Sequence, residues 1–292
     1  MLVLGCRATE PAPQPDAARS VPSPPPQRDR LADGCPASAP ASWVGCEDFD
    51  AIDDPRLQLG EWLVFDRGFE LVADDRGGQM LAVHLRPYVG FGGWVTLRIG
   101  AGPESPQHGA EIDAADEHFD ALWLRYRLRT VDDWPGHAIG DFGELIAMDP
   151  QRWAIAAEIA IRAEDDLRLA PLGWSCIEPD GRLRCDGRND WRGGLRNIWR
   201  AHGTTTWFDA AHAGTWRCIE AYVRLDEHDD GEAQVWIDGE LQAQGSALRF
   251  RGPWRDAGLN ALRFTSYTDP PPRPLSFFID EVVFATARVG CE

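Results

Sequence analysis

The chain contains no lysine, and its 29 arginines are outnumbered by 47 acidic residues, which gives a formal net charge of −18. This charge makes nucleic acid an improbable partner, because the phosphate backbone is bound through basic surfaces. No run of twenty apolar residues occurs, which excludes a transmembrane helix. No internal repeat of 20–50 residues occurs either, and the absence of any Cys-x-x-Cys pair disfavours a zinc site.

Tryptophan, by contrast, is abundant, with 13 copies in 292 residues of which 43% are hydrophobic. That length and hydrophobic content suit a single large β-sandwich, since all-β domains of roughly 200–250 residues are routine. Tryptophan packs well in cores, and its flat ring also covers the apolar face of a sugar. Arginine in a binding site offers a planar fork that fits carboxylate or sulfate.

The first residues contain Val3-Leu4-Gly5-Cys6, which resembles a bacterial lipobox with Cys6 as the lipidated residue. Five preceding residues are too few for a signal peptide, so the true start is predicted to lie upstream. A Pro-, Ala- and Ser-rich stretch follows, and its composition predicts a disordered linker. We therefore predict three segments: a signal remnant over 1–6, a linker over 7–42 and a folded domain over 43–292. The expected location is secreted or in the cell envelope (periplasm or outer membrane), with membrane contact only through the lipid anchor.

The folded part alternates apolar and polar residues, as strands with one buried face do. In the clearest example, even positions 122–128 suit the core and odd positions 123–129 face the other way. Residues 154–163 fit either a strand or a helix, and the context favours a strand. Residues 186–206 are predicted to be a long loop. Near the C-terminus, Asp238-Gly239 separates two alternating runs and predicts a tight hairpin. The pattern places further strands at 62–65, 69–72, 80–85, 94–99, 140–148, 216–225, 234–241, 260–267, 277–284 and 288–291.

Six cysteines follow Cys6, an even number that suggests disulfides in an exported chain. The segment from Cys176 to Cys185 is symmetric about Asp180-Gly181. A two-residue turn there would set the two cysteines opposite each other on a non-hydrogen-bonded pair, about 4.5 Å apart at Cα and within disulfide range. We therefore predict a Cys176–Cys185 bridge.

Several C-terminal motifs together resemble the concanavalin A-like lectin/glucanase superfamily, and most closely its polysaccharide-lyase-like jelly rolls. The motifs are Trp216-x-x-x-Glu220, the Asp238-Gly239 hairpin after Val-Trp-Ile, Ile279-Asp280-Glu281-Val-Val, and Arg288-Val-Gly-Cys291. The resemblance implies an all-β antiparallel sandwich and a carbohydrate ligand. It does not imply a reaction, because lectins, hydrolases and lyases share this fold.

Further expectations follow from the resemblance. Terminal strands of jelly rolls often lie side by side, which implies a Cys46–Cys291 bridge. Cys35 and Cys218 then remain as a pair, although Cys218 could equally be a buried free thiol. Many such folds hold a structural Ca²⁺ between the first and last strands, and Asp280 with Glu47 or Asp48 matches those positions. The alternative for these carboxylates is an ordinary acidic surface. No cofactor is expected to be required.

Candidate catalytic residues come from two of the predicted strands. Glu220, Tyr222 and Arg224 share one face of their strand, and Arg125 and Arg127 share one face of another. β-Elimination on a uronic acid needs a group that neutralises the carboxylate and a base that takes the C5 proton, and Arg and Tyr supply this chemistry. His137 and His202 are alternative bases. The competing interpretation is a solvated face of Arg–Glu pairs, and the compact Arg-x-Glu-x-Arg and Gln-x-His motifs of alginate lyases are absent.

A non-catalytic interpretation assigns the tryptophans to sugar stacking. Trp191, Trp199 and Trp207 lie in or beside the long loop, and Trp123 joins Glu220 as a candidate binding residue; any of the three loop tryptophans could instead belong to the core. A glycosidase is less well supported. Glu111-Ile-Asp-Ala-Ala-Asp116 resembles the catalytic strand of family 16 glucanases, but it ends in Asp116 rather than Glu.

The sequence therefore favours an exported, lipid-anchored carbohydrate-binding protein whose ligand is a polysaccharide, with anionic polymers among the candidates. The alternatives are a lyase that cleaves uronic-acid polysaccharides by β-elimination and a non-catalytic structural lipoprotein of the cell envelope.

Overall fold

The protein is described from a computed structural model that covers residues 38–50, 62–65, 68–74, 77–90, 93–99, 119–148, 155–177, 195–226, 228–252 and 257–291. These residues form fifteen β-strands and one 3-10 helix of three residues, Ala210–His212. Within the same ranges, no helix is long and apolar enough to span a membrane. The strands are β1 (Trp43–Glu47), β2 (Trp62–Phe65), β3 (Phe69–Ala73), β4 (Gln79–Leu85), β5 (Trp94–Arg98), β6 (Ala121–Thr130), β7 (Asp141–Met148), β8 (Ile155–Arg162), β9 (Leu172–Ser175), β10 (Arg196–Arg200), β11 (Arg217–Arg224), β12 (Gly231–Ile237), β13 (Glu240–Leu248), β14 (Gly258–Thr265) and β15 (Leu275–Ala285).

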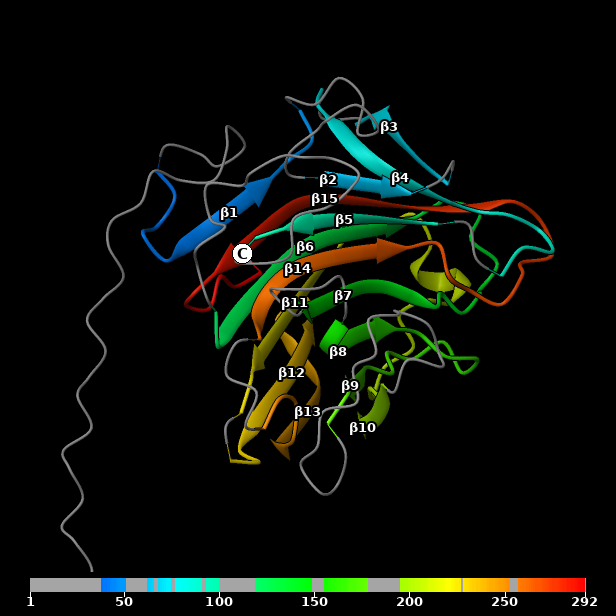
Figure 1. The fold of residues 1–292 in the computed structure, drawn as a ribbon. Coiled ribbons are helices and arrows are strands. Elements are labelled where there is room, and N and C mark those ends of the chain that lie inside the picture. Colours follow the sequence, from blue (N-terminus) through cyan, green and yellow to red (C-terminus); the bar gives the residue numbers. More distant parts are fainter. Residues whose placement is uncertain are drawn as a thin grey trace, which may run out of the picture.

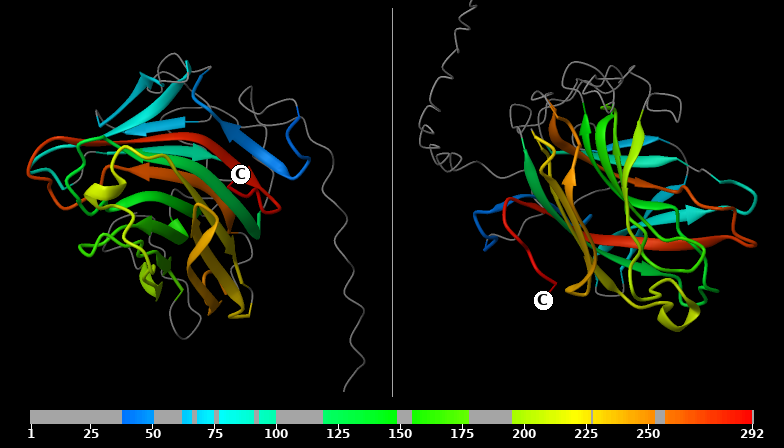
Figure 2. Two further views of the ribbon diagram at one scale, coloured as in Figure 1. Left: turned by 180° about the vertical axis from the view of Figure 1, so that it is seen from behind. Right: turned by 90° about the horizontal axis from the view of Figure 1, so that it is seen from below.

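The strands make two antiparallel sheets that stack as the layers of a sandwich (Figures 1 and 2). The eight-stranded sheet has the order β13-β12-β11-β6-β15-β4-β3, with β1 also paired to β15. The seven-stranded sheet has the order β10-β9-β8-β7-β14-β5-β2. Six of the thirteen neighbouring strand pairs join consecutive strands, and the other seven, such as β6–β15 and β7–β14, join strands that are not consecutive. Each sheet therefore combines local hairpins with contacts between remote segments.

The core lies between the sheets, and the two-residue period decides which side chains enter it. On β6, Leu122, Leu124, Tyr126 and Leu128 are buried while the intervening residues are only partly covered, as the sequence predicts. On β14 of the facing sheet, Phe264 packs edge-on against Tyr126, with 5.4 Å between ring centroids. Each fully buried large side chain of this kind stabilises the fold by about 1.5–3 kcal/mol.

The predicted hairpin at Asp238-Gly239 is confirmed. Both residues have positive φ, 49° and 80°, as a type I′ turn requires, and Ile237 pairs with Glu240 across it. The Asp238 carboxylate also accepts hydrogen bonds from the Cys218 amide and the Arg217 guanidinium, each at 2.8 Å. The turn is therefore fastened to the start of β11 as well as to its own strands.

Two of the predicted segments differ in the structure. Part of the expected loop over 186–206 is strand β10, which pairs with β9 at the edge of its sheet. Its adjacent Ile198 and Trp199 both pack against the core across a register shift, so no two-residue period marks it in the sequence. Residues 288–291 form no strand; after β15 they turn back toward β11, with Gly290 at a φ of 84°.

The cysteine pairing also differs. Cys218 is bonded to Cys291, with 5.7 Å between their Cα atoms, so the expected Cys46–Cys291 and Cys35–Cys218 bridges are both wrong. The terminal strands do lie side by side, but Cys46 stands opposite Val283, and the chain continues past β15 before Cys291 reaches β11. Cys46 and Cys176 are each disulfide-bonded. Cys35 and Cys185 lie outside the described residues, as does Cys6.

Candidate functional site

The first candidate surface is the outer face of β6 and β11 in the eight-stranded sheet. These strands are neighbours, with Trp123 opposite Tyr222 and Arg125 opposite Glu220. Because paired residues point to the same side of a sheet, these four side chains share one face. The sequence-based prediction of their common orientation is therefore confirmed. Whether they bind a ligand depends on what else they contact.

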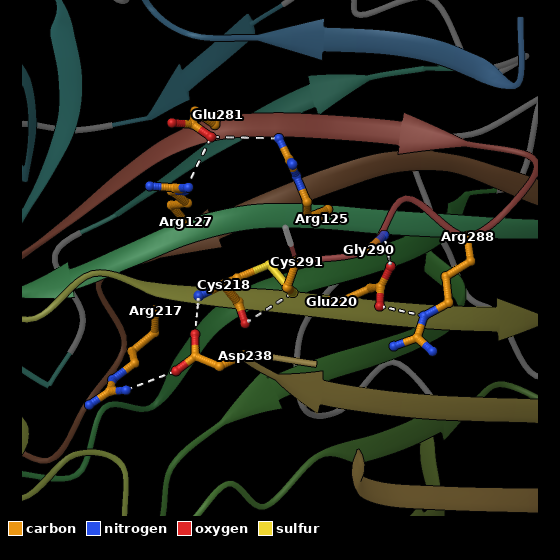
Figure 3. The surroundings of a disulfide bond; sticks show 10 residues. All are labelled: Arg125, Arg127, Arg217, Cys218, Glu220, Asp238, Glu281, Arg288, Gly290 and Cys291. Atoms are coloured by element: carbon orange, nitrogen blue, oxygen red, sulfur yellow. Dashed lines mark hydrogen bonds and ion pairs between the residues drawn. A yellow bond between two sulfur atoms is a disulfide. The ribbon is translucent and has the colours of Figure 1, made fainter. Parts of the chain in front are cut away.

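The arginines of this face are held by carboxylates of the same sheet. A bulge in β15 leaves Glu281 at a φ of 50°, between the register positions of Asp280 and Val283. Its carboxylate lies 3.6 Å from Arg125 and 3.1 Å from Arg127, and both guanidinium groups point toward it in Figure 3. Further along the face, Arg224 is paired with Asp230 and Glu232. These contacts match the competing interpretation of a face composed of Arg–Glu pairs.

Tyr222 is poorly suited to act as a base near neutral pH. Burial raises the pKa of its phenol, and the charge of Glu232 raises it further, whereas Arg224 opposes the shift. A phenol with a raised pKa is protonated at neutral pH and does not readily accept the C5 proton of a sugar.

The C-terminal segment covers another part of this face. Glu220 is fully buried and accepts a hydrogen bond from the Arg288 guanidinium and one from the Gly290 amide, each at 2.8 Å (Figure 3). The Arg288 guanidinium also lies over the ring of Trp236, 4.5 Å from its centroid, and 5.7 Å from that of Trp123. Glu220 and Trp123, predicted to bind substrate, therefore hold this segment in place together with the Cys218–Cys291 disulfide.

The remaining predicted residues are dispersed. Trp199 and Trp207 are partly buried against the core, and Trp207 also lies under the Arg217 guanidinium at 4.7 Å. Nε2 of His137 lies 2.8 Å from the Asp269 carbonyl and 3.3 Å from the Thr268 hydroxyl. Because a carbonyl only accepts, Nε2 carries the proton in the shorter contact. His202 lies 3.9 Å from Glu164. Trp191, Glu111 and Asp116 fall outside the described residues.

The three carboxylates expected to bind calcium make separate local contacts. Asp280 accepts a hydrogen bond from the Glu281 amide and Glu47 one from the Phe49 amide, each at 2.7 Å, while Asp48 accepts one from the Asp50 amide. In the part of the chain that the structure describes, no group of three or more His, Cys, Asp or Glu side chains is suited to a metal. The calcium site therefore stays a prediction.

A second candidate surface, which the sequence did not indicate, lies on the outer face of the seven-stranded sheet. Leu145 of β7, Ile159 of β8 and Leu262 of β14 point into the core, so the residues that alternate with them point outward. The outward residues include Glu144, Glu158 and Arg263, and all three are largely buried, with side-chain exposed fractions of 3%, 9% and 16%. Charged residues are almost never buried to this degree unless they are paired.

One guanidinium holds this cluster together. Arg263 is ion-paired through Nε to Glu144 and lies 3.4 Å from Glu158 through a terminal nitrogen. Its charge centre also lies 6.0 Å from the ring centroid of Trp94 on β5. On the side of the cluster away from Trp94, Glu158 is paired with Trp174 of the neighbouring strand β9. The cluster is therefore flanked by two indole side chains, one on each side along the sheet.

Burial changes the protonation of the two glutamates. It raises the pKa of Glu158 from 4.5 to about 7, with Arg263 opposing the shift and Asp141 adding to it. Burial likewise raises the pKa of Glu144 well above its ordinary value, while Arg263 again acts in the opposite direction. Arg263 is shared by two buried carboxylates, and the charge of Asp141, which faces Arg162, raises the pKa of both glutamates further. The cluster therefore retains a proton near neutral pH and can both donate and accept one.

The sequence contained one signal for this cluster. Glu158 interrupts the apolar stretch Ile155-Ala-Ala-Glu-Ile-Ala-Ile161, where a charged residue is unexpected. That stretch is apolar on both faces, because Ile146, Ile155 and Ala261 form a small cluster on the outer face under Leu195. The alternation therefore does not indicate which face is outward, and it does not identify Glu158 as a residue of a site.

These features define the protein as an all-β sandwich of two antiparallel sheets, with a charged, tryptophan-flanked outer face on the seven-stranded sheet. Among solved structures, it is similar to the endo-β-1,4-glucuronan lyase of the fungus Trichoderma reesei (TM-score 0.51, 12% identity, 84% of this chain and 96% of that one). It is also similar to the alginate lyase vAL-1 of a Chlorella virus (TM-score 0.52, 12% identity, 84% and 93%). At this identity the likeness establishes the fold, as the sequence predicted. No family model and no curated protein matches the sequence.

Proposed function

We propose that this protein binds a uronic-acid polysaccharide on the outer face of its seven-stranded sheet, centred on Arg263. The observation that carries the proposal is the buried Glu144–Arg263–Glu158 cluster between Trp94 and Trp174. Burying charged groups on a sheet surface contributes little to stability, because desolvation offsets the attraction between them. Ligand binding explains such a cluster better than stability does, and the indole rings beside it can stack on the apolar faces of sugars.

The cluster can bind an acidic ligand although it contains two carboxyl groups, because it retains a proton. A protonated glutamic acid donates a hydrogen bond, and Arg263 adds a charge-assisted one, so both can bind the carboxylate of a uronate. The solved structures of similar fold support this choice, since two of them are lyases named for glucuronan and alginate. The arginines of the eight-stranded sheet are also paired, with Glu281, Asp230 and Glu232. That sheet is less suitable because the C-terminal segment, held by Glu220, covers part of its outer face.

Affinity electrophoresis in gels that contain glucuronan, alginate or a neutral β-glucan tests this proposal. The acidic polymers are expected to retard the protein, and the neutral one is not. Trp174→Ala should weaken the retardation about tenfold, because the stacking of a sugar ring on the indole is lost. Arg249→Gln, an exposed arginine paired with Asp229, is the matched control. Equal retardation of wild type and Trp174→Ala would contradict the location of the site.

Cleavage by β-elimination is the second candidate function, and the raised pKa of Glu158 favours it. In this reaction Arg263 and the protonated Glu144 would neutralise the uronate carboxylate, and ionised Glu158 would take the C5 proton. The C5–H electron pair forms the C4–C5 double bond, the C4–O bond breaks, and the departing oxygen takes a proton from water. The product is an unsaturated uronate that absorbs ultraviolet light.

An ultraviolet assay against a panel of uronic-acid polysaccharides tests cleavage and locates the base. Loss of the absorbance rise in Glu158→Gln, with the rise retained in Tyr222→Phe, is the expected result. The reverse pattern would place the base on the eight-stranded sheet and contradict the assignment. Retardation in the gels without any rise in absorbance would leave polysaccharide binding as the function.

We also propose that the protein is exported and anchored through Cys6. Disulfide-bonded Cys46, Cys176, Cys218 and Cys291 support export, because such bonds persist in oxidising compartments. Metabolic labelling with a radioactive fatty acid tests the anchor, and a Cys6→Ala variant that still takes up label would contradict it.

A further inference from the structure

A cavity of about 440 Å³ opens at one end of the seven-stranded sheet, where β8 and β14 end and β7 begins. This volume lies within the range of small-molecule sites. Its walls come from the residues that precede β7, from the ends of β8 and β10, and from the residues that follow β8 and β14. The polar side chains of the walls include Arg162, Glu164, Asp165, Arg200, Tyr267 and Asp269.

Of the two arginines that line this cavity, Arg162 is less fully hydrogen-bonded than Arg200. Its closest carboxylate is Asp141, with 3.7 Å between the terminal nitrogen and Oδ1, which exceeds hydrogen-bonding distance. Its buried Nε has no hydrogen-bond partner among the described residues, and neither has Oδ1 of Asp141. Arg200 differs, because it is hydrogen-bonded to Glu164. Because that Nε is buried, a ligand anion in the cavity would meet the other part of the Arg162 side chain, which is 22% exposed in total.

The wall beside Arg162 is held in a fixed shape. The Thr268 hydroxyl donates to the Ala138 carbonyl at 2.7 Å, and His137 contacts Thr268 and the next carbonyl. Gly140 lies so close to the neighbouring chain segment that a Cβ atom there would stand 2.0 Å from the Tyr267 carbonyl oxygen. The wall is thus preformed, and binding would require little ordering of it.

The cavity is joined to the charged cluster through Asp141. This aspartate pairs with Arg162 and also acts electrostatically on Glu144, Glu158 and Arg263. A polysaccharide lying across the cluster and directed along β8 would reach the cavity with one of its residues.

We propose that this cavity is a subsite for one uronic-acid residue of the bound polysaccharide, with Arg162 as the group that binds its carboxylate. The inference rests on the proposed binding function and extends it to a specific subsite. The exposed Asp165 and Asp269 accept hydrogen bonds from sugar hydroxyls, and Tyr267 lines the same space.

Calorimetric titration with short oligosaccharides of glucuronic acid, two to four residues long, tests the subsite. Arg162→Gln should weaken binding of the disaccharide at least about tenfold, as loss of a charge-assisted pair requires. Ala138→Leu, which narrows the cavity while leaving Arg162 in place, should weaken it similarly. Arg249→Gln is the control, and thermal unfolding of each variant verifies its fold.

The outcomes separate the two proposals. If wild type binds polymeric glucuronan and both cavity variants bind the disaccharide as wild type does, the subsite is overturned and the proposed function stands. If wild type binds no uronic-acid polymer or oligosaccharide, both are overturned. A disaccharide whose binding is weakened by Arg162→Gln and Ala138→Leu, but not by Arg249→Gln, supports the subsite.

Discussion

Glu158 differs from an ordinary surface glutamate because its carboxyl group is buried beside another glutamate that shares its cationic partner, Arg263. Its pKa in the folded protein is about 7, above the ordinary value of 4.5 that applies to an unfolded chain. Between these two values the folded state holds more protons than the unfolded state. The stabilising contribution of the protonated group is therefore complete below about pH 4.5 and is lost as the pH rises toward 7.

This difference predicts a pH-dependent stability. Wild-type stability should fall by up to roughly 3 kcal/mol between pH 5 and pH 8 through this group, since each pKa unit corresponds to about 1.4 kcal/mol. Glu158→Gln should flatten that slope, because glutamine does not ionise. Urea unfolding at several pH values measures both, with exposed Glu240→Gln as the control. An unchanged slope in Glu158→Gln would contradict the assignment.

A second prediction at the scale of a single residue concerns the contribution of Glu220 to stability. It is fully buried, and Glu220→Ala removes the acceptor for both the Arg288 guanidinium and the Gly290 amide. We expect a loss of about 2–4 kcal/mol in the free energy of unfolding, because charged hydrogen bonds and a buried partner are lost together. Chemical unfolding measures the loss. Glu232→Ala, at a more exposed position of the same sheet, is the matched control, and a cost equal to that of the control would mean that Glu220 does not hold the C-terminal segment.

Among the elements, β6 and β8 differ in how clearly their sequences predict the inward face of the strand. Three arginines, Arg125, Arg127 and Arg129, alternate with apolar residues of β6, so the sequence identifies both the strand and its inward face. β8 is buried on both faces, which its sequence expresses as a nearly continuous apolar run. Such a run fits a strand or a helix equally well. The preference for a strand is confirmed, yet its outward face, which carries Glu158, was not predictable.

A third prediction, at the scale of an element, concerns the stability of the turn in the β12–β13 hairpin. Gly239 has a φ of 80°, a conformation that residues with a Cβ atom rarely adopt. Gly239→Ala should lower stability by about 1 kcal/mol. A Cβ atom at this position would meet nothing within 4 Å, so the cost is conformational rather than steric. Thermal unfolding measures it against exposed Ser246→Ala on β13; an equal midpoint in the two variants would contradict the turn assignment.

For the whole molecule, the Cys218–Cys291 disulfide joins residues 73 positions apart and holds the C-terminal segment on the eight-stranded sheet. Replacing both cysteines by serine should lower the free energy of unfolding by about 2–5 kcal/mol, since the unfolded chain then gains freedom. Denaturant unfolding under non-reducing conditions tests this expectation. The seven-stranded sheet carries the proposed site, so binding of glucuronan by the folded double variant should be retained; its loss would connect the C-terminal segment to the ligand.

The sequence by itself determined the all-β class, the inward faces of β6 and β11 and the hairpin at Asp238-Gly239, because these depend on a two-residue period and on local turn chemistry. Only the tertiary structure decided which strands became neighbours. Arg263 meets Glu144 and Glu158 across separations of 119 and 105 residues. Cys291 likewise reaches Cys218 only because the chain turns back after β15. Contacts between such distant segments arise from the stacking order of the strands, which local patterns in a single sequence do not encode.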